Sequence, residues 1–158
     1  MERRVNVRGI IVNDKGRLFA VKHRTHEGHE SDYWATPGGG LDQGESLHDG
    51  LTREFIEEIG VTLKIGKLLF MQQFTSQNPS GNARELMEFF FHVENASDFI
   101  GEIDLSATSH GHEITRVDFI NPAESDILPN FLRNVDLKSY IDSDLPVRII
   151  DNLHETPR

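Results

Sequence analysis

Residues 39–61 read GGLDQGESLHDGLTREFIEEIGV, and glycines at both ends of this stretch enclose a segment rich in acids. Ser46 followed by Asp49 has the spacing of a helix N-cap with a capping box. Gly60 suits the left-handed residue that follows a helix end. The stretch therefore predicts a helix over residues 47–59 that is approached through a glycine-rich turn.

The expected helix separates its acids from its apolar side chains. On a 3.6-residue period Glu54, Glu57 and Glu58 fall on one face, beside an apolar face. Carboxylates on one face repel each other, and divalent cations with oxygen ligands, Mg²⁺ above all, relieve that repulsion. The alternative is an ordinary amphipathic helix with a solvated acidic face. That alternative explains the helix but neither the glycines nor the spacing, so we favour a metal-binding face.

The spacing of this stretch resembles the signature of the Nudix hydrolases (MutT-like), G-x5-E-x7-R-E-U-x-E-E-x-G-U, in which U is a bulky aliphatic residue. One position departs from it, because Phe55 stands where Leu, Ile or Val is usual. Every glycine and polar position is filled, by Gly39, Glu45, Arg53, Glu54, Glu57, Glu58 and Gly60. The resemblance is therefore specific over 23 residues, and the order of expected elements agrees with it loosely over residues 3–141.

The resemblance implies an α/β fold, an α/β/α sandwich around a mixed β-sheet. It also implies Mg²⁺-dependent hydrolysis of a phosphoanhydride in a nucleoside diphosphate linked to another moiety, with Mn²⁺ as a second usable ion. The alternative is a non-catalytic nucleotide-sensing module with a Nudix-like fold. Such modules typically lose motif carboxylates, whereas this chain keeps all of them.

The resemblance also assigns roles to individual residues. The metal ligands would be the carbonyl of Gly38 and the carboxylates of Glu54, Glu57 and Glu58. Either Glu54 or another of these acids, or the loop acid Glu113, would deprotonate the attacking water. Arg53 would orient a carboxylate through a bidentate pair, a task that lysine performs poorly. Structural positions within the motif would be Gly39, Glu45 and Gly60.

The remainder of the chain alternates as strands and polar loops. Residues 3–12 and 17–24 predict a hairpin around a turn at 13–16. Further strands are expected at 34–36, 61–77, 84–95 and 113–120. From about residue 121 the chain is helix-prone, chiefly over 128–140, and we expect a docked C-terminal helix followed by a frayed tail.

Three loops are expected to choose the substrate, at residues 25–33, 76–83 and 96–113, because loops on a rigid scaffold usually carry specificity. Arg24 ends the second strand, where similar proteins often carry a base facing the substrate phosphates. His26 and His29, and likewise His110 and His112, leave a zinc-like site open as an alternative. Solvated loop histidines are much commoner than such a site.

Composition limits the classes of function. A chain of 158 residues with 37% hydrophobic and 27% charged residues predicts one globular domain over 1–158. The net charge of −10 argues against nucleic-acid and membrane-surface partners, although a small nucleotide remains compatible with it. The lack of a long apolar run, of a signal-like start and of cysteine predicts a cytoplasmic protein. Since dimers are common among similar proteins, a homodimer is compatible with the resemblance.

Overall fold

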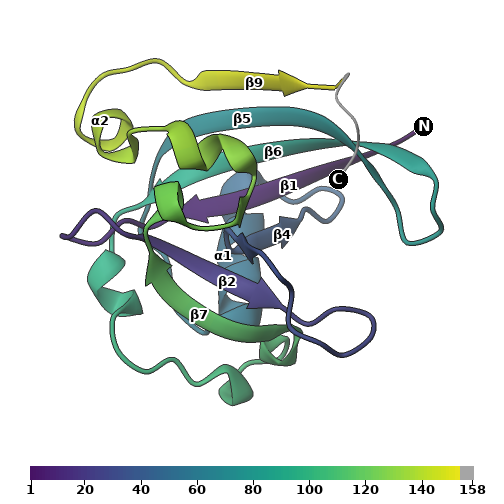
Figure 1. Cartoon of the computed structure of the whole chain (residues 1–158), viewed down its shortest axis with the longest axis horizontal. Helices are drawn as coiled ribbons and strands as arrows, with labels where there is room; N and C mark the ends of the chain where they lie inside the picture. The colour runs from purple at the N-terminus through teal and green to yellow at the C-terminus, as the bar shows by residue number, and fades with distance from the viewer. Residues whose placement is uncertain (154–158) are drawn as a thin grey trace.

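The structure, a computed structural model, describes residues 1–153, and within them the strands form two mixed β-sheets (Figure 1). Across the first sheet the order is β4 (Gly38–Gly40), β1 (Glu2–Ile10), β6 (Ala83–Val93), β5 (Ile65–Gln77) and β9 (Arg148–Asn152). Across the second sheet the order is β7 (Ile114–Ile120), β2 (Leu18–His23), β3 (Trp34–Ala35) and β8 (Ile127–Leu128). Each sheet contains both parallel and antiparallel pairs, as the predicted α/β sandwich requires.

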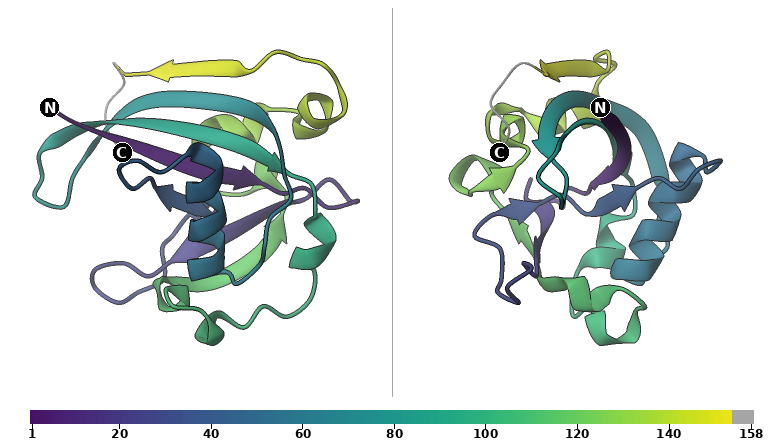
Figure 2. Two further views of the ribbon diagram at one scale, coloured as in Figure 1. Left: turned by 180° about the vertical axis from the view of Figure 1, so that it is seen from behind. Right: turned by 90° about the vertical axis from the view of Figure 1, so that its right-hand side faces the viewer.

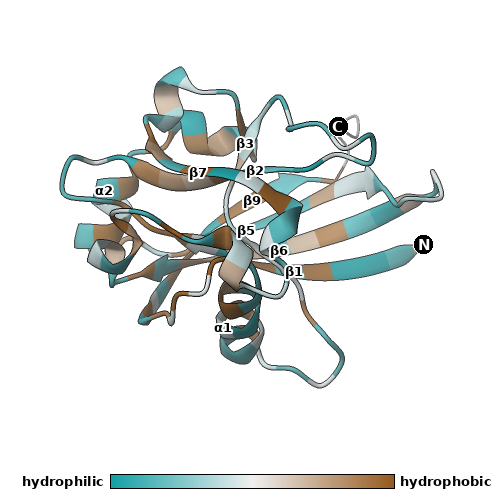
Figure 3. Ribbon diagram, turned by 90° about the horizontal axis from the view of Figure 1, so that it is seen from below, coloured by the Kyte–Doolittle hydropathy of each residue, from teal (hydrophilic) through white to brown (hydrophobic). Residues whose placement is uncertain are grey.

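Helices cover the sheets on opposite sides. Helix α1 (Leu47–Glu58) lies on one side, and the 3-10 helix η5 (Asn130–Asn134) and helix α2 (Leu137–Asp142) lie on the other (Figure 2). Leu51 and Phe55 of α1 are buried in one hydrophobic cluster, and Leu132 and Leu137 are buried in a second. Apolar and polar residues occupy different faces of α1 (Figure 3). The predicted α/β/α sandwich is confirmed.

The ends of α1 follow the sequence prediction. Ser46 adopts an extended conformation, and its side chain accepts a hydrogen bond from the backbone N–H of Asp49 at 3.0 Å. Gly60 has φ +80° and donates its backbone N–H to the carbonyl of Phe55. Because both ends are fixed locally, the direction of the acidic face of α1 is fixed as well.

The predicted hairpin over residues 3–12 and 17–24 is wrong in its pairing. The turn at 13–16 forms, with the Gly16 N–H donating to the Asn13 carbonyl at 3.0 Å. However, β1 pairs with β4 and β6, whereas β2 pairs with β3 and β7. Beside the turn the two segments meet through a bridge between Val12 and Leu18 and a hydrogen bond from the Phe19 N–H to the Ile11 carbonyl at 2.8 Å. The chain therefore leaves one sheet and enters the other at this turn.

The C-terminal prediction also needs correction. In place of one helix over 128–140, the chain forms β8, then η5, then the short helix α2. The interruption lies at Val135 and Asp136, which are extended, and the side chain of Asp136 begins α2 by accepting a hydrogen bond from the Ser139 N–H. The segment expected to be a frayed tail contains strand β9, which pairs in parallel with β5. Residues 154–158 of that expected tail lie outside the described residues.

The predicted loop at 96–113 contains three short 3-10 helices, η1 (Ala96–Phe99), η2 (Leu105–Ala107) and η3 (Gly111–Glu113). A further one, η4 (Pro122–Glu124), follows β7. Within the described residues, every helix falls short of the length and apolar character of a membrane span.

Candidate active site

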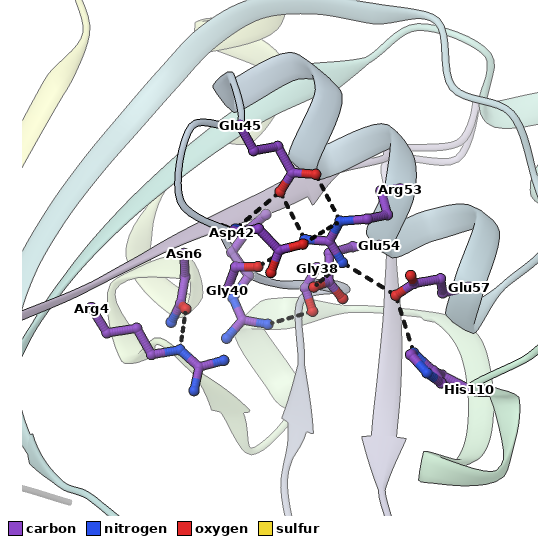
Figure 4. Close-up of polar contacts among 11 residues, drawn as sticks. Arg4, Asn6, Gly38, Gly40, Asp42, Glu45, Arg53, Glu54, Glu57 and His110 are labelled. Atoms are coloured by element: carbon purple, nitrogen blue, oxygen red, sulfur yellow. Dashed lines mark hydrogen bonds and ion pairs between the residues drawn. The ribbon is translucent and has the colours of Figure 1, made fainter.

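The guanidinium of Arg53 collects the polar groups of the acidic helix (Figure 4). Its Nε and Nη2 donate to the two carboxylate oxygens of Glu45 at 2.7 and 2.8 Å, and Nη2 also donates to the Gly40 carbonyl at 3.0 Å. Its Nη1 donates to Glu54 at 3.1 Å and to Glu57 at 3.2 Å. Hydrogen bonds from Arg53, together with one from the backbone N–H of Asp42, lower the pKa of Glu45 to about 2. Arg53 therefore ties α1 to the glycine strand before it.

Two glycines leave room for carboxylates. A Cβ on Gly39 would lie 2.6 Å from the carboxyl group of Glu54. A Cβ on Gly50, inside α1, would collide with the side chain of Leu41 and lie 3.0 Å from Glu45 Oε1. Contact with these side chains explains why glycine stands in a helix interior, where alanine is favoured by about 1 kcal/mol on propensity alone.

Glu58 is the acid that the helix buries. The residue is 7% exposed, and within the described residues its Oε2 is buried without a hydrogen-bond partner. Burial, and then the neighbouring carboxylates of Glu54, Glu113 and Glu57, raise the pKa of Glu58 to about 8, although Arg8 opposes the shift. Burial also raises the pKa of Glu54. A buried carboxyl oxygen without a partner is unfavourable, so the site lacks a positive or hydrogen-bonding group at this point.

The loop before β7 closes over the C-terminal end of α1. The backbone N–H of His110 donates to the Glu57 carbonyl at 2.7 Å, and the hydroxyl of Thr108 donates to the Glu58 carbonyl at 3.3 Å. His110 Nδ1 lies 3.1 Å from Glu57 Oε2, so this histidine contacts the acidic face directly. Within the described residues, no three His, Asp or Glu side chains stand together as a ready metal site, and the histidine alternative gains no third ligand.

Arg24 and Glu113 lie side by side. The backbone N–H of Arg24 donates to the Glu113 carbonyl at 2.8 Å, and its Nε donates to the His112 carbonyl at 3.1 Å. Both residues are exposed, and Glu113 is close enough to Glu58 to contribute to its raised pKa. The structure thus brings Glu113 to the carboxylates of α1, whereas the guanidinium of Arg24 rests on loop carbonyls.

A pocket of about 290 Å³ opens between the two sheets, and it shares Arg8 with the acidic site. Nη1 of Arg8 donates to the Gly38 carbonyl at 3.2 Å. The described lining comprises Arg8, His23, Tyr33, Ala35, Gln72, Phe74, Thr75, Glu88, Leu128, Pro129, Asn130 and Asn152. Aromatic rings beside amide groups suit a heteroaromatic ligand with hydrogen-bonding edges.

The sequence prediction missed most of this pocket. Of the three loops expected to choose the substrate, one reaches the described lining, through Tyr33. His23, the residue before Arg24, lines the pocket at the end of β2, where the pairing of β2 with β7 shifts in register. Residues 128–130 and Asn152 come from the C-terminal segment that was expected to be helix and tail. Pro129 and the β-branched residues of β9 were the available signals.

A family model described as NUDIX domain matches residues 2–140, and this chain belongs to that family. The chain is 39% identical over 67 residues to the RNA pyrophosphohydrolase of Vibrio cholerae serotype O1, a match that covers 42% of this chain and 36% of the relative. It is 30% identical over 70 residues to Nudix hydrolase 2 of Arabidopsis thaliana, covering 44% of this chain and 25% of that one. The matches therefore span less than half of these curated relatives.

Solved structures agree on the fold. The MutT protein from Methanosarcina mazei Go1 superimposes with a TM-score of 0.65 at 18% identity, over 89% of this chain and 94% of that chain. The ADP-ribose pyrophosphatase from Streptococcus suis 89-1591 superimposes with a TM-score of 0.60 at 16% identity, over 92% and 98%. At this level of identity the likeness supports the fold alone.

Arg53→Lys should fold as the parent does and lose about tenfold to a hundredfold in kcat/KM, because a point charge cannot satisfy Glu45, Glu54 and Glu57 together. Steady-state kinetics and thermal unfolding measure the two properties. If the lysine variant kept the parental kcat/KM, Arg53 would be an ordinary surface helix residue.

Glu58→Gln should abolish most of the Mg²⁺-induced rise in melting temperature and leave the protein in EDTA as stable as the parent, or slightly more stable. Glutamine keeps the shape of the side chain but cannot ionise to bind a cation, and it replaces a buried carboxyl group whose ionised form is costly without a cation. Asp49→Asn, at an exposed position of the same helix, is the matched control and should keep the parental Mg²⁺ shift. A parental shift in Glu58→Gln would exclude Glu58 from metal binding.

His23 should make the protein sensitive to acid. Burial, and then the charge of Arg8, lower the pKa of His23 from 6.5 to about 4. A lowered folded-state pKa gives stability that is present above the unfolded pKa and is lost as pH falls toward 4. Between pH 7 and pH 5 the parent should lose about 2 kcal/mol more unfolding free energy than His23→Gln.

Urea unfolding at pH 7, 6 and 5 measures this difference, with His26→Gln in the exposed loop as the control that keeps the parental slope. Equal slopes for the parent and His23→Gln would contradict a buried neutral histidine in the pocket.

Proposed function

We propose that this chain hydrolyses a phosphoanhydride bond in a nucleoside diphosphate linked to another moiety, with Mg²⁺ or Mn²⁺ as cofactor. The observation that carries the proposal is the buried Oε2 of Glu58, which has no hydrogen-bond partner within residues 1–153. It lies in a cluster of carboxylates that adjoins a pocket with aromatic and amide groups. Membership of the NUDIX domain family and the names of the relatives support it.

The types of donor suit a hard divalent cation, although within residues 1–153 these side chains are not already grouped as a complete metal site. Glu54, Glu57 and Glu58, with the Gly38 carbonyl, would supply oxygen ligands, and the orphaned oxygen of Glu58 is the clearest sign that a cation belongs there. When bound, the cation would neutralise the charge that develops on the phosphate oxygens. Arg53 already holds Glu54 and Glu57 on one side, so these carboxylates keep their spacing before a cation arrives.

The acids of the site divide the remaining work. A water molecule attacking phosphorus must lose a proton, and Glu54 and Glu113 are the acids proposed to accept it. Glu113 is exposed and adjoins Glu58, so it can exchange that proton with solvent. Tyr33 and Phe74 would flank the base of the nucleotide, while Gln72 and Asn130 offer hydrogen bonds to its edge.

A release assay tests the proposal. The purified protein is incubated with Mg²⁺, Mn²⁺ or EDTA and a panel comprising ADP-ribose, NADH, nucleotide sugars, dinucleoside polyphosphates, oxidised nucleoside triphosphates and a 5′-triphosphorylated RNA. The expected result is metal-dependent release of a nucleoside monophosphate or pyrophosphate from at least one class, and its loss in Glu57→Gln by about a hundredfold or more. Binding of a panel member without turnover would instead favour the nucleotide-sensing module.

A further inference from the structure

Arg8 lies where the pocket meets the acidic helix, although it is outside the family signature. Its side chain is 20% exposed and lines the pocket, while Nη1 donates to the carbonyls of Thr36 and Gly38 at 3.3 and 3.2 Å. Its charge favours the ionised forms of Glu54 and Glu58 and disfavours protonation of His23. The guanidinium therefore acts on both the pocket and the carboxylate cluster.

A buried carboxylate fixes this guanidinium. Glu88 of β6 is 4% exposed, and its Oε2 accepts hydrogen bonds from Arg8 Nε at 2.9 Å and from Asn6 Nδ2 at 3.2 Å. Asn6 and Glu88 are register partners in the parallel pair of β1 and β6. Because burying a carboxylate without a partner is costly, Glu88 holds Nε in place. Nη2 has no hydrogen-bond partner within the described residues, and it remains available to a ligand.

We propose that Arg8 binds the substrate phosphate that lies on the pocket side of the scissile anhydride, and that Glu88 is the positioning residue that fixes its guanidinium. The inference rests on the proposed function. A diphosphate that runs from the pocket to the carboxylates of α1 passes Arg8, whose Nη2 can donate two charge-assisted hydrogen bonds to phosphate oxygens. Nε and Nη1 meanwhile hold the guanidinium against Glu88 and against the carbonyls of Thr36 and Gly38.

The competing explanation is that Arg8 and Glu88 form a purely structural ion pair. Removing one partner would leave the other charge buried, so a single truncation would confuse folding with binding. Two substitutions avoid this problem. Arg8→Lys keeps the charge opposite Glu88 but loses the fork, and the double variant Arg8→Gln with Glu88→Gln removes both charges together.

The chain supplies a matched control on the same two strands. Arg3 of β1 pairs with Glu85 of β6 at 2.8 Å, away from the pocket lining, with side chains 62% and 26% exposed. Arg3→Lys, and Arg3→Gln with Glu85→Gln, therefore change the same residue types in the same sheet. They should leave ligand binding at the parental level.

Calorimetric titration with methylenediphosphonate in Mg²⁺ measures binding without turnover, and thermal unfolding with and without Mg²⁺ reports folding and metal binding. Arg8→Lys, which keeps the charge, should keep the parental Mg²⁺ shift, and both Arg8 variants should bind methylenediphosphonate about tenfold to a hundredfold more weakly. With the best panel substrate the loss in kcat/KM should lie chiefly in KM. Glu88→Gln leaves Arg8 in place but removes the carboxylate that fixes its guanidinium. This variant should weaken binding of methylenediphosphonate by a smaller factor than the Arg8 variants do.

Parental affinity for methylenediphosphonate in either folded Arg8 variant would overturn the inference, and so would a parent protein that does not bind this ligand. If the parent binds it but hydrolyses no panel member, the proposed function fails while the comparison of affinities still decides the role of Arg8.

Discussion

The interaction on which the acidic site depends is the attachment of one guanidinium, that of Arg53, to four carboxylates and a carbonyl. Six acids and one base lie within residues 42–58, and like charges at this density would separate without a common partner. Glu45 takes two of the hydrogen bonds, and they raise the pKa of Arg53 while they lower that of Glu45. The same guanidinium binds the Gly40 carbonyl, so the charge that holds the acids together also holds β4 against α1.

This arrangement gives a physical reason for the fixed spacing of residues 39–61. Gly39 has no side chain because the carboxyl group of Glu54 occupies the place where a Cβ would lie. Gly50 has none because Leu41 and Glu45 fill the corresponding space. Glu45 precedes α1 by two residues and still reaches Arg53, since the turn before Ser46 brings it back over the helix. The spacing of glycines and acids in residues 39–61 therefore depends on contacts between side chains as well as on helical periodicity.

The sequence predicts features that depend on neighbouring residues, such as helix ends. It does not predict which strands pair when they lie far apart along the chain. Ser46 and Gly60 mark the helix ends, and the 3.6-residue period places Glu54, Glu57 and Glu58, because these signals act within a few residues. One of the two partners of β1 is β6, a strand about 80 residues away along the chain. Nothing near the turn at 13–16 therefore indicates that β1 and β2 enter different sheets. Arg8 and Glu88 meet through that same pairing. The pocket, which draws on both sheets and on Asn152, was beyond sequence reasoning for the same reason.

Two arginines thus bind several of the acids around this site, and neither of them binds Glu58. Arg53 binds Glu45, Glu54 and Glu57, and Arg8 binds Glu88. Glu58 lies among these groups and, at 7% exposure, is the most buried acid of α1. Within the described residues, no donor reaches its Oε2. A fold selected for stability alone would place an apolar residue there, because a buried carboxyl without a partner costs free energy. Under the proposed function, a cation that arrives from outside the chain would supply the positive charge that this acid lacks, and metal-dependent hydrolysis would require that cation.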